Sequence, residues 1–384
     1  MIALASLFAL TLAAPPVAPP PSLALDRVPD EQRERYTRLA SELWAVFDST
    51  RGGFVTKGGV PSESAIELAF RLGAEPGGGP WRARALATTR WTMALLDTVG
   101  GGFVHGAKDA DPSHPAFSKW TTDNARRIEL ALEASRITGD PAFRKIAERA
   151  VRYADRVLLD GRGGFVHGQV GDRQLVPESN GPMILTWLRF GAETGDVRYR
   201  DFAWKSLDRL WSECRREGAG MIRRGVFGEL TTYPKLADQT EMVRAYALAA
   251  HVAGRAQDLE RARTLADQLI SWIQPGCGLR SEARPNKQGR LRAGPCRYEE
   301  NSRAALALAE LAAIAGESRY RDAAKRLVED FDEALRRDHG LDGADWALAL
   351  RAIRSPELPE RATWRAAPAE TPRETRFPAK KGKK

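Results

Sequence analysis

The hexamer GGFVHG occupies residues 101–106 and recurs letter for letter at 163–168, and a related stretch, RGGFVTKGG, begins at Arg51. Each copy lies between two segments in which apolar residues return every three or four positions, the spacing of an amphipathic helix. A motif repeated at a regular interval between helices is typical of a chain built from helical hairpins. We expect the glycines to let the chain leave a helix at positive φ, and the phenylalanine to pack between neighbouring hairpins.

The alternation of helical segments with glycine-bearing loops predicts twelve helices in six pairs. The predicted segments are 30–48, 62–72, 81–97, 122–138, 141–159, 180–194, 197–216, 238–254, 257–273, 298–315, 317–337 and 344–353. A long loop joins the two helices of each pair, and short turns such as TGD at 138–140 and 194–196 join successive pairs. An open solenoid can carry this signature, but six pairs are also the number that closes an (α/α)6 toroid.

The composition of the helices favours closure. Second helices of the pairs, such as NGPMILTWLRFGA at 180–192, are rich in Ala, Leu and Gly, whereas first helices such as YRDFAWKSLDRLW at 199–211 carry more charge. Helices that are apolar most of the way round belong inside a fold, and amphipathic helices belong outside. We therefore predict an all-α, six-hairpin (α/α)6 toroid over 30–354, with the six glycine loops on one rim beside the N-termini of the inner helices.

Four stretches of this pattern resemble a known family. They are GGGFVHG with FSKWTTDNARR (matching at Phe117, Lys119, Asp123 and Asn124), ESNGPMI (Asn180, Gly181, Met183 and Ile184), LADQTEM (Asp238) and YEENSRAA (Asn301). The chain is similar there to the helical region of the thioredoxin-domain-containing, spermatogenesis-associated-protein type family. The resemblance implies the fold of the six-hairpin glycosidase-like toroids. The family's N-terminal thioredoxin-like domain has no counterpart in this sequence, so the resemblance supports a fold far more than a reaction.

The ends of the chain differ in composition from the repeats. An apolar run at 2–14 has the length of a signal-peptide core, although no Lys or Arg precedes it. We predict a leader over 1–22, a linker over 23–29, a disordered basic Pro-rich tail over 355–384, and a secreted or periplasmic location. Cys277 and Cys296 bracket one loop, so export would allow a disulfide there, and two unpaired thiols are the alternative.

The net charge of +9 invites a nucleic-acid hypothesis. Arg and Lys are interleaved with Asp and Glu along the helices, as on solvated helix faces, so we predict no nucleic-acid partner and no membrane insertion after removal of the leader. No CxxC, HxxxH or EF-hand spacing occurs, and we expect no metal and no cofactor. The expected partner is a small-molecule or oligosaccharide ligand bound by a monomer.

Polar and aromatic residues gather where the inner helices are predicted to begin. Asp123 and Asp238 are the predicted catalytic pair, with Glu300 in reserve, because an inverting glycoside hydrolase needs two carboxyl groups about 6.5–9.5 Å apart. The residues predicted to bind substrate are His105, Trp120, Asn124, His167, Asn180, Tyr233, Tyr298, Asn301 and Trp346. Amide, hydroxyl and carboxylate side chains also cap helices, which is the structural alternative for each of them.

Two further functions fit the same rim. His105 and His167 stand two residues after the repeated phenylalanine, and as a proton-transfer pair they would suit a sugar epimerase. A toroid that only binds a carbohydrate or a partner is the non-catalytic alternative.

Overall fold

A computed structural model describes residues 23, 25–108, 111–169, 173–225, 233–285, 291–329 and 340–361, with twelve α-helices in this part of the chain. They are α1 (Arg33–Ala45), α2 (Glu63–Gly73), α3 (Gly79–Met93), α4 (Thr121–Thr138), α5 (Pro141–Tyr153), α6 (Pro177–Thr194), α7 (Val197–Cys214), α8 (Leu236–Ala253), α9 (Ala256–Ser271), α10 (Tyr298–Ala315), α11 (Ser318–Glu329) and α12 (Gly343–Arg354). The even-numbered helices follow the glycine loops.

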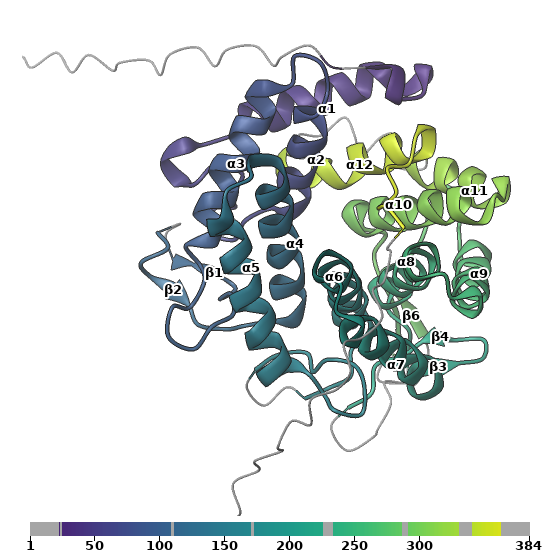
Figure 1. The fold of residues 1–384 in the computed structure, drawn as a ribbon. Helices are drawn as coiled ribbons and strands as arrows, with labels where there is room; N and C mark the ends of the chain where they lie inside the picture. The colour runs from purple at the N-terminus through teal and green to yellow at the C-terminus, as the bar shows by residue number, and fades with distance from the viewer. Residues whose placement is uncertain are drawn as a thin grey trace, which may run out of the picture.

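The helices form two concentric rings (Figure 1). Helices α2, α4, α6, α8, α10 and α12 form the inner ring, in which each helix contacts the next and α12 returns to α2. Each inner helix from α2 to α10 packs against the outer helix that follows it, and α1 packs against α12. The prediction of an (α/α)6 toroid with the second helix of each pair inside is confirmed.

Several helices begin earlier than predicted. Pro177 opens α6, where its missing N–H costs nothing because the first turn of a helix has no intrahelical acceptors for those groups. The outer helix α5 continues into a π-helical turn over Ala154–Leu158. The predicted leader over 1–22, most of the predicted tail (362–384) and the end of the segment predicted at 317–337 lie outside the described residues.

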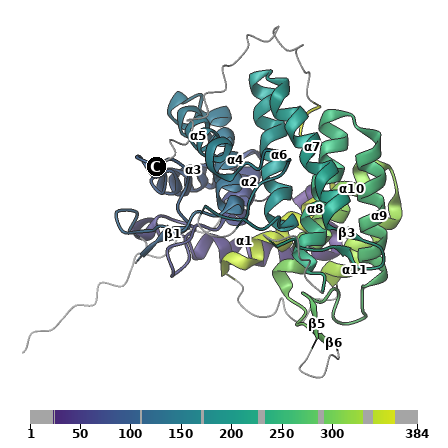
Figure 2. The same ribbon diagram turned by 90° about the horizontal axis from the view of Figure 1, so that it is seen from below.

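Three of the loops that lead into inner helices each contain a short β-hairpin. Strand β1 (Gly106–Ala107) pairs with β2 (Pro115–Ala116), β3 (Arg215–Arg216) with β4 (Gly220–Met221), and β5 (Ala283–Pro285) with β6 (Leu291–Ala293), all antiparallel. Figure 2 shows them towards the same end of the helices. The loops therefore share one rim, as predicted.

A side-chain amide holds each of two GGFVHG loops. Asn124, the fourth residue of α4, accepts the Phe103 N–H through Oδ1 at 2.7 Å and donates from Nδ2 to the carbonyls of Phe103 (3.2 Å) and Trp120 (2.9 Å). Gly102 precedes Phe103 at φ +74°, and a Cβ there would lie 2.3 Å from the Tyr153 ring. The repeated hexamer is thus a packed turn, and both repeated phenylalanines are fully buried as predicted.

The same amide clamp recurs at the fourth residue of three more inner helices. It joins Asn180 to Phe165, Gln239 to Met221, and Asn301 to Leu279, with N–H···O distances of 2.7, 2.6 and 2.7 Å. The prediction that Asn124, Asn180 and Asn301 bind substrate is therefore corrected. All three are fully buried, and their amide groups are used by backbone groups of their own repeat.

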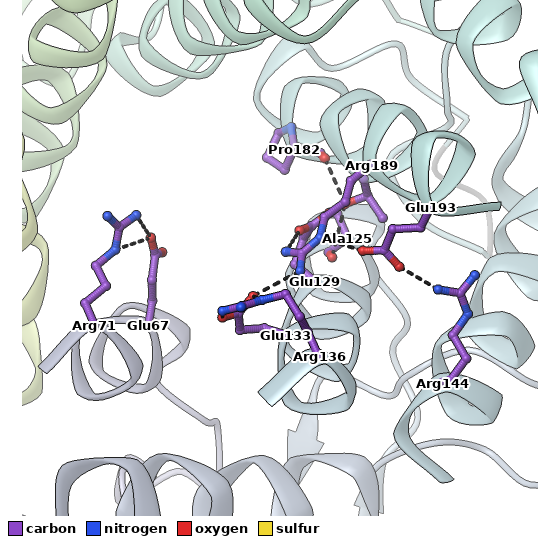
Figure 3. A network of polar contacts seen from close by, with 11 residues as sticks. Glu67, Arg71, Ala125, Glu129, Glu133, Arg136, Arg144, Pro182, Arg189 and Glu193 are labelled. Atoms are coloured by element: carbon purple, nitrogen blue, oxygen red, sulfur yellow. Dashed lines mark hydrogen bonds and ion pairs between the residues drawn. The ribbon is translucent and has the colours of Figure 1, made fainter. Parts of the chain in front are cut away.

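The inner face of the ring is ionic rather than aromatic. Partly exposed positions recur at helical spacing along α4 (122, 126, 129 and 133) and α6 (178, 182, 185 and 189), which marks one face of each helix. Figure 3 shows Arg189 of α6 among Glu129, Glu133 and Glu193, with the Glu67–Arg71 pair of α2 across from them. Arg189 reaches these three glutamates at 2.7, 3.0 and 3.1 Å.

The chain after α12 crosses the C-terminal ends of the inner helices, opposite the rim of the glycine loops. Glu357 forms ion pairs with Arg351 of α12 (2.7 Å) and Arg71 of α2 (3.2 Å), and His251 at the end of α8 donates from Nε2 to the Pro359 carbonyl at 3.0 Å. Residues 355–361 thus belong to the folded unit, and the predicted boundary at 354 is too early.

A disulfide joins Cys277 and Cys296, with 5.7 Å between their Cα atoms, and closes the loop before α10. The pairing that the sequence left open is therefore present. None of the helices in the described part of the chain combines the length and apolarity that crossing a bilayer requires.

Candidate acid–base site at the rim

The amide clamp occupies the same position in four of the hairpins, so the residues next to it can be compared from one hairpin to the next. The residue before the clamping amide is Asp123, Ser179, Asp238 or Glu300, and the second residue after the clamped loop residue is His105, His167, Arg223 or Ser281. In the first three of these repeats the two positions bond to each other. The candidate site is therefore a set of equivalent side-chain pairs, each placed by its own buried amide.

His105 and Asp123 form the most accessible of these pairs. Nδ1 of His105 lies 2.7 Å from Oδ2 of Asp123, while the side chains remain 42% and 15% exposed. The hydrogen bond to Asp123 raises the pKa of His105 above its ordinary value, against partial burial and the charge of Arg127. A carboxylate on Nδ1 fixes the ring and leaves Nε2 for another partner, so His105 is placed to exchange a proton with a ligand.

A buried arginine fixes the backbone beneath His105. Arg127 has no exposed surface and donates to the carbonyls of Val104 and His105, the latter at 2.6 Å. Its Nε lies 3.4 Å from Oε1 of Glu63 on α2, so one guanidinium joins two inner helices and the loop between them. This arrangement leaves the His105 loop little freedom to move.

His167 occupies the equivalent position in the next repeat. Its Nδ1 lies 2.5 Å from Oγ of Ser179, and its ring packs against Trp120 at 5.1 Å between centroids. The His167 carbonyl accepts the Thr121 N–H at 3.0 Å, where α4 begins. The structure therefore places the predicted residues His105, His167 and Trp120 on neighbouring loops of one rim.

Asp238 is not available as the second carboxyl of a catalytic pair. It is 1% exposed, its Oδ1 accepts the Glu178 N–H at 3.0 Å, and its Oδ2 accepts from Nε of Arg223 at 2.8 Å. Burial raises the pKa of Asp238 to about 6, although Arg223 opposes the change. The predicted pairing of Asp123 with Asp238 is corrected, because Arg223 and the start of α6 cover Asp238.

The remaining predicted residues divide into buried and accessible groups. Trp346 is 1% exposed and Tyr298 is 7% exposed, so both are packing residues rather than the ligand contacts predicted. Tyr233 is half-buried just before α8. Glu300 is half-buried, and its Oε2 has no hydrogen-bond partner among the described residues.

The sequence prediction missed the arginines of the inner face. The residues two positions after the clamping amide are Arg126, Pro182, Glu241 and Arg303. They lie on the face of each inner helix that looks towards the ring axis. A signal was present, because the pattern of acid, Asn, small residue and Arg occurs twice, as DNAR at 123–126 and ENSR at 300–303. The same residues also suit a plain helix start, which hides any second role in the sequence.

Two surface hollows lie away from this rim. One of about 350 Å³ lies beside Asp30, Arg321 and Arg354, and one of about 570 Å³ lies between α9 and α11. Both involve outer helices, so the site is defined by the rim geometry instead. Within the described ranges, no three His, Cys, Asp or Glu side chains gather closely enough to hold a metal ion.

Solved structures share this architecture. A D-mannose isomerase superposes with a TM-score of 0.68 at 12% identity, covering 86% of this chain and 99% of its own. A sugar epimerase from a ruminal bacterium gives 0.66 at 13% identity, covering 83% and 98%. An unsaturated glucuronyl hydrolase from Bacillus sp. GL1 gives 0.57 at 14% identity, covering 76% and 85%. No family model matches the chain. These likenesses establish the class of the fold, a six-hairpin glycosidase-like toroid.

Proposed function

We propose that this chain is a carbohydrate-processing enzyme of the isomerase or epimerase class, with His105 as its proton-transfer group. The observation that carries the proposal is the 2.7 Å contact between Nδ1 of His105 and Oδ2 of Asp123 on a ring that stays 42% exposed. The paired-carboxylate chemistry of a glycoside hydrolase fits less well, because Asp238 is buried against Arg223.

The reaction needs only proton transfers. Neutral His105 would take the proton from the sugar carbon beside the carbonyl through Nε2. The electron pair of that C–H bond forms the C=C bond of an enediolate, and the carbonyl oxygen takes the negative charge. Asp123 stabilises the resulting imidazolium. For isomerisation the hydroxyl proton moves from one enediolate oxygen to the other, and the imidazolium returns its proton to the neighbouring carbon. For epimerisation a different proton reaches the same carbon from the other face. His167 on the next loop is the candidate donor of that proton, and His105 passes the proton that it took to the solvent.

The structural neighbours support this class of reaction. Two of them are a sugar epimerase and a D-mannose isomerase, and the match covers 98% and 99% of their chains. At this low sequence identity the match supports the toroid fold only. The choice of an isomerase or epimerase reaction rests on the His105–Asp123 pair. The disulfide at Cys277 and Cys296 supports the further proposal that the protein is exported, which a localisation assay on the full chain would test.

Hydrogen exchange with the solvent tests the reaction without knowledge of the product. The protein is incubated in D2O with glucose, mannose and cellobiose, and deuterium at C2 is measured by NMR. We expect incorporation by the wild type and a loss of about 100-fold or more in His105→Gln. The matched control is His114→Gln, an exposed histidine of the same rim loop that should leave the rate unchanged.

A glycoside hydrolase is the second candidate, favoured by the unpartnered buried Oε2 of Glu300. A glycoside hydrolase needs a carboxyl group as the acid of the reaction, and Glu300 would be that group. Release of reducing sugar that is lost in Glu300→Gln, without deuterium at C2, would replace the first proposal with this one. Binding without either reaction would establish the non-catalytic toroid.

A further inference from the structure

Two arginines occupy equivalent positions in two of the repeats. Arg126 on α4 and Arg303 on α10 each stand two residues after a clamping asparagine, and in the ring of inner helices α4 and α10 lie opposite each other. Their side chains are 22% and 38% exposed. Both therefore belong to the face that looks onto the ring axis.

Each of these arginines uses only part of its guanidinium. Arg303 makes one contact, from Nε to Oδ1 of Asp345 at 3.3 Å, and Arg126 makes one, from Nη2 to Oε1 of Glu241 at 3.1 Å. Arg244, by contrast, holds Glu310 with two nitrogens. Among the described residues, both terminal nitrogens of Arg303 have no hydrogen-bond partner.

The carboxylates near Arg303 have donors of their own. Asp345 accepts from Oγ of Ser64 at 2.6 Å, Glu241 from Arg126, and Glu63 from Arg127. Asp345 first, and then Glu241 and Glu63, raise the pKa of Arg303. The guanidinium is thus charged and partly exposed, and its neighbouring carboxylates do not occupy all of its nitrogens.

A continuous chain of contacts joins Arg303 to the acid–base pair. Arg303 and Ser64 share Oδ1 of Asp345, and Ser64 follows Glu63 on α2. Arg127 links Glu63 to the backbone of His105 at 2.6 Å. These contacts run from α10 through α12 and α2 to the loop before α4, so they connect Arg303 to His105 along one half of the ring, at the N-terminal turns of the inner helices.

We propose that Arg303, with Arg126 across the ring, binds the carboxylate of an acidic sugar, so that the substrates of the rim site are uronates. A planar guanidinium with two free nitrogens matches the two oxygens of a carboxylate, and a neutral hydroxymethyl group offers no such partner. The inference rests on the proposed function for its choice of a sugar, and Arg303 is the residue that determines specificity.

Equilibrium binding tests this without turnover. Calorimetric titration of the full chain compares glucuronate, galacturonate and mannuronate with glucose, galactose and mannose. We expect at least one uronate to bind tenfold or more tightly than its neutral counterpart, and its affinity to fall with added salt. Arg303→Gln should remove most of this preference and Arg303→Lys part of it. Arg90→Gln, an exposed arginine on the outer helix α3, is the matched control and should keep it.

The outcomes separate this inference from the proposed function. Equal binding of acidic and neutral sugars, no binding of either, or unchanged uronate binding by folded Arg303→Gln overturns it. The exchange assay is repeated with the uronate that binds. Arg303-dependent binding of that uronate without deuterium exchange at its C2 would uphold the inference and reject the isomerase. Deuterium exchange into neutral aldoses, without exchange into any uronate, would uphold the isomerase and reject the uronate inference. If the Arg303 variants do not fold, the ratio of the wild type's affinities for a uronate and for its neutral counterpart tests the inference by itself.

Discussion

Asn180 holds Phe165 by both ends of its peptide backbone, accepting the Phe165 N–H at 2.7 Å and donating to the Phe165 carbonyl at 2.9 Å. A third bond, from Nδ2 to the Val176 carbonyl at 2.9 Å, ties the clamp to the residue before α6. Because Phe165 packs against Trp187 at 4.8 Å between ring centroids, the clamp joins the rim to the core.

We predict that Asn180→Ala destabilises the protein by about 2–4 kcal/mol, since it leaves buried backbone groups without partners. Asn180→Asp should cost at least as much, because the carboxylate keeps the acceptor for Phe165 but places a buried charged oxygen against the carbonyls of Phe165 and Val176. Thermal unfolding measures both, with Lys145→Ala on the exposed side of α5 as a control. A variant as stable as the wild type would show that the clamp does not stabilise the rim.

Much of the fold could be predicted from residue order alone. Helical periodicity is a local property, and the count of glycine loops established the number of hairpins before any contact was known. The boundary at 354 was wrong because the side chain that extends it, Glu357, acts through partners far away in sequence, such as Arg71. The resemblance to the thioredoxin-domain-containing family stays a prediction.

The site was harder to predict, because a helix start and a ligand site use the same residue types. Asp123 and Asp238 stand in equivalent positions, yet one faces a histidine and the other an arginine. That difference depends on which residue stands two positions after the clamped one in each loop. The roles proposed for Arg126 and Arg303 depend on which face of their helix looks towards the ring axis. The sequence shows this only once the position of the clamping asparagine in each helix is known.

The His105–Asp123 pair should be visible by titration. Asp123→Asn removes the carboxylate whose charged hydrogen bond raises the pKa of His105, so we expect that pKa to fall towards its ordinary value. The stabilising effect of the pair is full at low pH, while His105 is protonated in both states, and is lost as pH rises through the raised pKa. NMR of the imidazole resonances measures the shift. Ser179→Ala, which alters His167 instead, is the control.

The C-terminal segment should contribute to stability through Glu357. Its carboxylate contacts Arg351 at 2.7 Å, and Arg351 is only 2% exposed, so Glu357→Gln weakens the compensation of a buried charge. Glu357 is itself 35% exposed, and we expect a modest loss of about 1–2 kcal/mol, seen as a melting temperature lower by a few degrees. Glu360→Gln, an exposed neighbour, is the control. Equal melting temperatures for wild type and Glu357→Gln would contradict a stabilising role for this contact.

Asp238 gives a pH dependence of definite sign. Its pKa of about 6 in the folded protein exceeds the 3.8 of an unperturbed carboxyl, because burial disfavours the charge more than Arg223 favours it. The wild type should therefore lose stability relative to the isosteric Asp238→Asn between about pH 4 and pH 6, by at most about 3 kcal/mol, and run parallel to it above. Urea unfolding at each pH measures the difference, and Asp322→Asn on the exposed side of α11 should show none. A wild type that gains stability over Asp238→Asn as the pH rises would mean that Arg223 outweighs burial, and that Asp238 is a fully ionised partner in the pair.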